Sequence, residues 1–178
     1  MLIKTIFSGF GGQGVIMMGY LLAVAGMYEE KNVTCLPSYG AEVRGGTASS
    51  TVVIATEEIA SPVASQPEFA VLMNGPSLFR FQNQVQSGGT IFINSSMVES
   101  RPVRGDLEIF EVPVNDLAKE SLGSKVANMI MLGAFIKKSG LVSLDTMVQV
   151  VKDTFGNRNP GVIKSNKAAL QIGFDYLK

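Results

Sequence analysis

The sequence predicts an α/β fold, in which a mostly parallel sheet is covered by helices on both faces. Short apolar runs alternate with helix-like segments over the first two thirds of the chain, and the last third is helical throughout. Apolar runs without strict alternation are typical of strands that are buried on both faces of a sheet. With 178 residues the chain is long enough to bury one core, so we expect residues 1–178 to form a single domain.

The first half of the chain opens with an apolar run at residues 2–7, which predicts a buried strand. A glycine-rich loop follows, and then a helix that ends near Tyr28. Its residues are apolar on nearly every side, so we expect this helix to be buried. A second strand is predicted over 33–36 and ends at Pro37, and a third, rich in β-branched residues, spans 48–55.

The second half begins with a strand at 69–73, which ends at the breaker sequence Asn74-Gly75-Pro76. The last helix has clear boundary signals, because Asn159 can cap it and proline suits its first position. Ligands of such open α/β sheets bind at the carboxyl ends of the strands. The other predicted elements are a short helix at 77–84, strands at 90–93 and 107–112, and helices at 114–121, 126–138, 144–155 and 160–176.

Composition excludes several classes of function. Fifteen basic and fifteen acidic residues cancel, and no basic stripe is present, so we expect neither nucleic acid nor a membrane as a partner. The longest apolar stretch, Val15–Met27, is interrupted by Gly19 and Gly26 and is too short to span a bilayer. No signal peptide is evident, and we expect the protein in the cytoplasm.

The chain has no histidine, and Cys35 is its only cysteine. An iron–sulfur cluster of the cubane type needs four thiolates, and zinc sites are built mainly from histidine and cysteine. The commonest general base is also missing. We therefore expect neither a metal site nor a catalytic residue on this chain, and we expect Cys35 to be a small core residue.

The loop after the first strand reads SGFGGQGV over residues 8–15. Gly9, Gly11 and Gly14 fit the pattern G-x-G-x-x-G in the strand–loop–helix context that gives this pattern meaning. Glycines allow a tight turn and a close approach of the backbone. Free N–H groups at the start of a helix favour an anion, usually a phosphate.

The same spacing fits the common nucleotide-binding motifs unequally. A nicotinamide or flavin dinucleotide is disfavoured, because the second strand ends without the Asp or Glu that would hold the ribose hydroxyls. A P-loop is excluded, since Val15 and Ile16 stand where Lys and Ser/Thr are required. The glycines could instead serve only close packing of helix on sheet, but such a turn would not require Phe10 and Gln13.

A second glycine-rich loop, SYGAEVRGG, follows the second strand. Arg44 offers a forked cation suited to phosphate or carboxylate, and Tyr39 offers a stacking face and a hydroxyl. Glu42 can pair with Arg44, in which case the loop is simply solvated. Gly45 and Gly46 close the loop. Because both glycine-rich loops follow strands, we expect them to lie together at one edge of the sheet.

Four segments carry a resemblance to a known family, in this order along the chain: GFGGQGV, PSYGAEVRGGTASS, EIASPVASQPEFAVLMN and NMIMLGA. They resemble the gamma subunit of 2-oxoacid:ferredoxin oxidoreductases, in the branch that includes the 2-oxoglutarate and 2-oxoisovalerate enzymes. Domain III of pyruvate:ferredoxin oxidoreductase belongs to the same family. The similarity covers most of the chain at the right spacing, and the helices after about Leu141 contribute less to it.

The resemblance implies a Rossmann-like domain without an iron–sulfur cluster. Members of the family convert a 2-oxoacid, coenzyme A (CoA) and oxidised ferredoxin into acyl-CoA, carbon dioxide and reduced ferredoxin. Thiamine diphosphate is held by the alpha and beta subunits, and the [4Fe-4S] clusters lie on beta or on a small delta subunit. The resemblance therefore implies alpha, beta and delta subunits as partners, with ferredoxin reached through the complex and no activity in the isolated chain.

In the fused relatives, the equivalent domain helps to cradle CoA near the thiamine site, which implies the same role for the two loops here. Amides of residues 11–14 and the guanidinium of Arg44 would suit the pyrophosphate and 3′-phosphate of CoA. The cofactor-binding residues expected on this basis are Gly9, Gly11, Gly12, Gln13, Gly14, Tyr39, Arg44, Gly45 and Gly46.

Two other functions stay open at this point: a purely structural subunit of the same complex, and a free-standing dinucleotide-binding oxidoreductase. The second is disfavoured by the missing acid after the second strand. Tyr39, Glu42 and Arg44 could also contact the alpha subunit rather than CoA. Contacts between two copies of the chain are left open as well.

Overall fold

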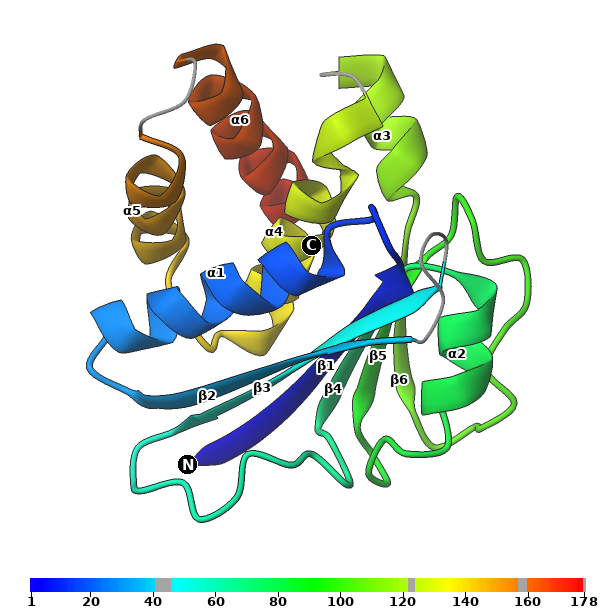
Figure 1. Cartoon of the computed structure of the whole chain (residues 1–178). Coiled ribbons are helices and arrows are strands. Elements are labelled where there is room, and N and C mark those ends of the chain that lie inside the picture. The colour runs from blue at the N-terminus through cyan, green and yellow to red at the C-terminus, as the bar shows by residue number, and fades with distance from the viewer. Residues whose placement is uncertain (41–45, 122–123, 157–159, 178) are drawn as a thin grey trace.

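The computed structural model describes residues 1–40, 46–121, 124–156 and 160–177. In these ranges, six strands form one mixed sheet, and six α-helices and a 3₁₀ turn pack around it (Figure 1). The strands are β1 (Leu2–Phe10), β2 (Asn32–Tyr39), β3 (Thr47–Ala55), β4 (Phe69–Leu72), β5 (Thr90–Asn94) and β6 (Glu108–Val112). The helices are α1 (Val15–Tyr28), α2 (Gly75–Phe81), α3 (Val114–Ser121), the 3₁₀ turn η1 (Ser124–Val126), α4 (Ala127–Ser139), α5 (Leu144–Phe155) and α6 (Pro160–Tyr176).

The strands lie in the order β2-β3-β1-β4-β5-β6, and of these described strands only β3 runs against the others. This confirms the mostly parallel sheet. The hairpin of β2 and β3 was not predicted; Tyr39 lies opposite Ala48 in it, and Phe10 of β1 lies opposite Thr47 of β3. The carboxyl ends of β1 and β2 therefore meet at the same edge of the sheet, where both glycine-rich loops begin.

Helices cover both faces of the sheet, as predicted, but unequally (Figure 1). Successive residues of a strand point to opposite faces. Phe7 and Phe92 thus belong to the larger core, which they share with α1, α3, α4, α5 and α6. Ile6 and Ile91 belong to the smaller core, which α2 and neighbouring loops cover. The larger core buries α1 and carries the helical C-terminal third.

Helix α4 lies at the centre of the larger core. The ring of Phe135 makes edge-on contacts with Phe7 and Phe92, with ring centroids 5.4 and 5.5 Å apart. On its other side, α4 crosses α6 at a point where both helices carry glycine. A Cβ on Gly133 would overlap the backbone of α6, and a Cβ on Gly173 would overlap that of α4. The two glycines therefore allow the helix axes to approach backbone to backbone.

The boundaries of the helices follow the predictions to within one residue, except at α2. Helix α2 both begins and ends earlier than the predicted 77–84. It begins earlier because the Asn74 side chain accepts a hydrogen bond from the Ser77 amide (2.9 Å) and Pro76 fits in the first turn. Asn159, the predicted cap of the last helix, lies outside the described residues. Across the described ranges, each helix is too short or too polar to cross a membrane.

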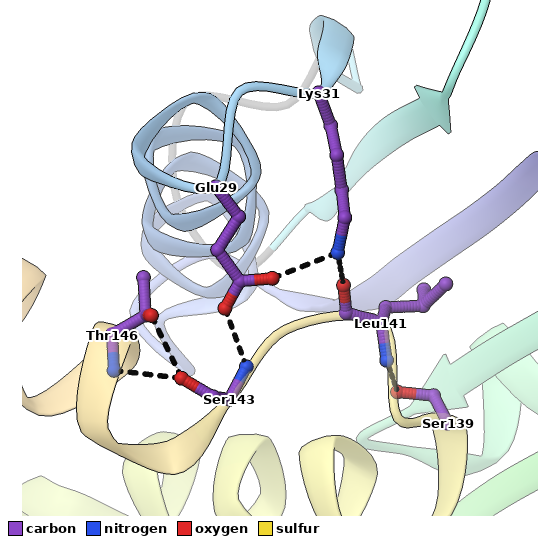
Figure 2. Close-up of polar contacts among 6 residues, drawn as sticks. All are labelled: Glu29, Lys31, Ser139, Leu141, Ser143 and Thr146. Carbon is purple, nitrogen blue, oxygen red and sulfur yellow. Dashed lines mark hydrogen bonds and ion pairs between the residues drawn. The ribbon is translucent and has the colours of Figure 1, made fainter.

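A polar cluster joins the end of α1 to the turn between α4 and α5 (Figure 2). Glu29 pairs with Lys31 (2.8 Å) and accepts a hydrogen bond from the Ser143 amide (2.7 Å), while Lys31 also donates to the carbonyl of Leu141. The hydroxyl of Ser143 caps α5 by accepting from the Thr146 amide (3.0 Å). Burial favours the neutral acid, but these hydrogen bonds outweigh it and hold the pKa of Glu29 at about 2.

Candidate functional site

The glycine loop joins the carboxyl end of β1 to the start of α1. Gly12 (φ 99°) and Gly14 (φ 75°) adopt backbone conformations that glycine tolerates and other residues rarely adopt. Gly14 is also the N-cap of α1, and a Cβ there would overlap the side chain of Asn128 on α4. Backbone conformation and packing therefore both require glycine at position 14.

The Gln13 side chain braces the loop through four hydrogen bonds. Its Oε1 accepts from the Phe10 amide (2.6 Å) and from Asn74 Nδ2 (3.1 Å). Its Nε2 donates to the carbonyl of Met73 (3.1 Å) and to the sulfur of Met97 (3.3 Å). All of its hydrogen-bonding capacity is used inside the protein, so Gln13 holds the loop against the carboxyl end of β4.

Neighbouring residues make room for this brace and support it. Gly9 is buried, and a Cβ there would lie 2.6 Å from Gln13 Oε1. Asn94 at the end of β5 donates to the Met73 carbonyl (3.2 Å) and to Asn115 Oδ1 (2.8 Å). The described contacts of Gly9 and Gln13 are thus internal, and their contact with a ligand stays a prediction.

The backbone amides of the loop divide into two sets. The Gly11 amide donates to the carbonyl of Gly46 (3.0 Å), and the Gln13 amide closes a turn within the loop (3.1 Å). The first bond confirms that the two glycine-rich loops meet. Within the described part of the chain, the amides of Gly12, Gly14 and the first turn of α1 make no hydrogen bond. These amides are the ones that could bind an anion.

A cleft beside the loop, which we call the inner cleft, has a volume of about 370 Å³. It lies over the ends of β1 and β4 and reaches η1 and the start of α4. Lys125 is exposed and brings a cation to its rim, and Asn128 brings an amide. The lining residues are Phe10, Gly12, Gln13, Gly14, Met73, Met97, Asn115, Lys125, Ala127 and Asn128.

A second hollow, which we call the tyrosine groove, lies on the other side of the loop and has a volume of about 560 Å³. Tyr20 of α1 and Tyr39 of β2 both line this groove, and Tyr39 is 70% exposed. The remaining walls are glycine-loop backbone and apolar side chains, so the groove suits an apolar or aromatic group. Arg44 and Gly45, which were predicted to bind the cofactor, lie outside the described residues, as does Glu42.

The electrostatics of this region favour an anion. Among the described residues that line the inner cleft and the tyrosine groove, Lys125 is the only charged one. No carboxylate in those linings opposes a phosphate. The positive end of the α1 dipole adds to the attraction, because the free amides of its first turn point out of the helix start.

Sequence reasoning did not single out three residues of this site. Asn128 begins the NMIMLGA segment, which carried the resemblance, but the motif gave no reason to place it beside Gly14. Lys125 precedes α4 in a 3₁₀ turn and has no motif of its own. Tyr20 stood inside a helix expected to be buried. Cys35, in contrast, was expected to be a small core residue; it is partly buried and packs against the larger core, with Sγ 3.5 Å from Ser50 Oγ.

The fold and the site together define a class of protein, namely a Rossmann-like α/β domain whose first loop presents free amides beside a cation. The chain belongs to the pyruvate ferredoxin/flavodoxin oxidoreductase family, whose model matches residues 4–176. Subunit KorC of 2-oxoglutarate synthase from Methanothermobacter marburgensis is 34% identical over 177 residues, which cover 96% of this chain and 94% of KorC. Subunit VorA of ketoisovalerate oxidoreductase from Methanothermobacter thermautotrophicus is also 34% identical, over 99% of this chain but only 36% of VorA.

Solved structures agree with this assignment. The gamma subunit of a keto/oxoacid ferredoxin oxidoreductase from Geobacter sulfurreducens matches with a TM-score of 0.86 and 26% identity, over 98% of this chain and 95% of that one. The 2-oxoglutarate:ferredoxin oxidoreductase from Magnetococcus marinus, solved with 2-oxoglutarate, CoA and succinyl-CoA bound, matches with a TM-score of 0.90. Its identity is 22%, and the match covers 98% of this chain and 30% of that longer chain, which shows a shared fold.

Proposed function

We propose that this chain is the gamma subunit of a 2-oxoacid:ferredoxin oxidoreductase. The whole complex would convert a 2-oxoacid, CoA and oxidised ferredoxin into acyl-CoA, carbon dioxide and reduced ferredoxin. Family membership and the match to KorC over nearly its full length support this role. The chain spans about a third of VorA, in keeping with a reaction that is shared among several parts of a larger assembly.

In this proposal, the chemistry lies on the partners. The alpha and beta subunits would hold thiamine diphosphate, and beta or delta would carry the [4Fe-4S] clusters that pass electrons to ferredoxin. A chain with one cysteine and no histidine is suited to binding rather than to redox chemistry. The cytoplasm, where such a complex meets its ferredoxin, is the location that follows.

The contribution of this chain would be to bind the nucleotide end of CoA and to direct its thiol towards the partner subunits. The observation that carries this role is the row of unpaired amides at Gly12, Gly14 and the first turn of α1, beside Lys125 and facing a cleft without a carboxylate. Phosphates of CoA would accept hydrogen bonds from those amides. Arg44 and the backbone of Gly45 and Gly46 would close the other side.

The bracing of the loop supports the same role. Anions bind more tightly to free amides when the loop already has the bound conformation, because ordering it on binding would cost affinity. The four hydrogen bonds of Gln13 and the Gly11–Gly46 bond supply that order in advance. The CoA bound in the Magnetococcus marinus enzyme, which contains this fold, is in keeping with the ligand proposed.

The assembled complex tests this function through the KM for CoA. We expect Arg44→Ala and Lys125→Ala each to raise this KM about tenfold, since a charge-assisted hydrogen bond is worth about 1.5–3 kcal/mol. The KM for the 2-oxoacid should stay the same. Arg80→Ala is the matched control, because Arg80 lies on α2 and covers the ring of Phe81.

The outcome separates the proposed role from its alternatives. A lower yield of assembled complex, with an unchanged KM for CoA in the complex that both variants do form, would indicate a purely structural subunit. A nicotinamide nucleotide that binds the isolated chain more tightly than CoA would indicate a free-standing oxidoreductase. Either result contradicts CoA binding at the glycine loop.

A further inference from the structure

A third hollow opens between the helices, and Lys125, which also lines the inner cleft, lies in its wall. This helix hollow, as we call it, has a volume of about 570 Å³ and is bounded by α1, η1, α4, α5 and α6. Its apolar walls include Met17, Met129 and Phe155. A cavity of this size with mostly apolar walls is typical of small-molecule sites.

A polar side chain, that of Asn166, lies in the wall of the helix hollow. Asn166 of α6 is only 8% exposed as a residue, but its amide borders the hollow and is not fully buried. Within the described part of the chain, this amide makes no hydrogen bond to the protein. A side-chain amide that faces a hollow without a protein partner has donor and acceptor positions available to a bound group. A bound group that both donates and accepts would complete this amide.

The helix hollow adjoins the candidate phosphate site. Lys125 and Asn128 line both the inner cleft and the helix hollow, and Met17 lines both the helix hollow and the tyrosine groove. A nucleotide whose phosphates lie on the amides of Gly12 and Gly14 would therefore have its base within reach of the helix hollow.

We propose that the helix hollow binds the adenine ring of CoA and that Asn166 reads the edge of that ring. The inference rests on the proposed function. Methionine and phenylalanine side chains would pack on the two faces of a flat ring. An asparagine amide matches adenine. The amide oxygen of asparagine accepts a hydrogen bond from the amino group of adenine, and the amide NH₂ of asparagine donates to the adjacent ring nitrogen of adenine. Asn166 is thus a specificity-determining residue for the nucleotide.

The test compares two nucleotides that differ only in the base. Adenosine 3′,5′-bisphosphate is the nucleotide fragment of CoA, and guanosine 3′,5′-bisphosphate is its counterpart. Calorimetric titration of the full chain should show the adenine compound binding at least tenfold tighter. Asn166→Asp replaces the donor by a second acceptor, which matches the N–H groups of guanine, so the preference should fall at least tenfold or reverse.

Gln171→Ala is the matched control, since Gln171 lies on the same helix, is exposed and pairs only with Asp175 among the described residues. Its base preference should equal that of the wild type. If Asn166→Asp does not fold, the ratio of the wild-type affinities for the adenine and guanine nucleotides decides alone.

The failure of this inference is distinguishable from failure of the proposed function. Equal wild-type affinity for both bases, with binding of both lost in Lys125→Ala, would overturn the role of Asn166 and leave phosphate binding intact. Absence of binding for both nucleotides, together with an unchanged KM for CoA in the Lys125→Ala complex, would overturn both.

Discussion

Individual side chains at this site act mainly by fixing the backbone. Gln13 is the clearest case, since its amide joins β1, the loop and the end of β4 through bonds to Phe10, Asn74 and Met73. An amide has two acceptor and two donor positions, and a carboxylate or an alkyl group of similar size cannot satisfy the same set. The identity of residue 13 therefore follows from the backbone groups around it.

Replacing Gln13 by leucine should destabilise the protein and loosen the loop. The Phe10 amide would lose its acceptor, so we expect the free energy of unfolding to fall by about 2 kcal/mol. Urea denaturation measures this loss, and the KM for CoA in the complex should rise as well. Gln171→Leu changes the same amide at an exposed position and should change stability by no more than about 0.5 kcal/mol. Equal effects of the two variants would show that the brace is unimportant.

Glu29 makes stability depend on pH. Its pKa is lowered in the folded protein from the ordinary 4.5 to about 2, so its contribution is complete above pH 4.5 and is lost as the pH falls towards 2. We expect Glu29→Gln to lower the free energy of unfolding at neutral pH by about 1–2 kcal/mol, allowing for solvent screening of a partly exposed pair.

Urea midpoints of wild type and Glu29→Gln at several pH values check this expectation. The difference between the two proteins should shrink below pH 4.5 and vanish near pH 2. Glu111→Gln serves as the control, because Glu111 pairs with Arg101 at the exposed surface. A difference that stays constant over this range would exclude Glu29 as the titrating group.

At the scale of whole elements, the α4–α6 crossing sets the distance between two walls of the helix hollow. Asn128 and Met129 lie near the start of α4, and Asn166 lies on α6. Their separation depends on how closely the two helices pack, which Gly133 and Gly173 decide by letting the backbones touch. The position of the hollow is therefore a consequence of helix packing.

Adding a methyl group at the α4–α6 crossing should destabilise the protein. In Gly173→Ala the new Cβ would overlap the carbonyl oxygen of Ile130, which is rigid helix backbone and cannot move aside. We expect the free energy of unfolding to fall by about 3 kcal/mol or more. Gly105→Ala places its Cβ in open space and should be nearly neutral. Thermal or urea unfolding of both variants measures the contrast, and similar stabilities would contradict the close crossing.

The sequence predicted elements better than it predicted their contacts. Apolar runs such as 90–93 and boundary signals such as Asn74 act over a few residues, so the strands and helices could be placed. The direction in which β2 and β3 pair depends on the rest of the sheet, and the hairpin was missed. The glycine loop was located by its spacing, but the internal role of Gln13 and the approach of Lys125 arise from residues far along the chain.

At the scale of the whole molecule, the candidate site consists of segments that are far apart in the sequence and lie close together in the fold. The glycine loop belongs to the first strand and helix, η1 and α4 lie more than a hundred residues later, and α6 closes the chain. These segments lie on the face of the sheet that carries the larger core, whereas α2 covers the opposite face (Figure 1). A ligand that spans them would connect segments that lie far apart in the chain.

CoA should therefore protect three distant segments at once. In hydrogen exchange of the full chain, we expect slower exchange at residues 12–17, 125–129 and 161–166 when CoA is added, because the phosphates and the base order them together. Residues 75–81 of α2 should not change and serve as the internal control. At a CoA concentration of about a hundred times its Kd, the free energy of unfolding should also rise by about 2.7 kcal/mol.

Protection confined to 12–17 and 125–129 would place the phosphates as proposed but the base elsewhere, since only the base reaches α6. Protection of none of the three, with binding demonstrated in the same sample, would move the whole nucleotide away from the glycine loop.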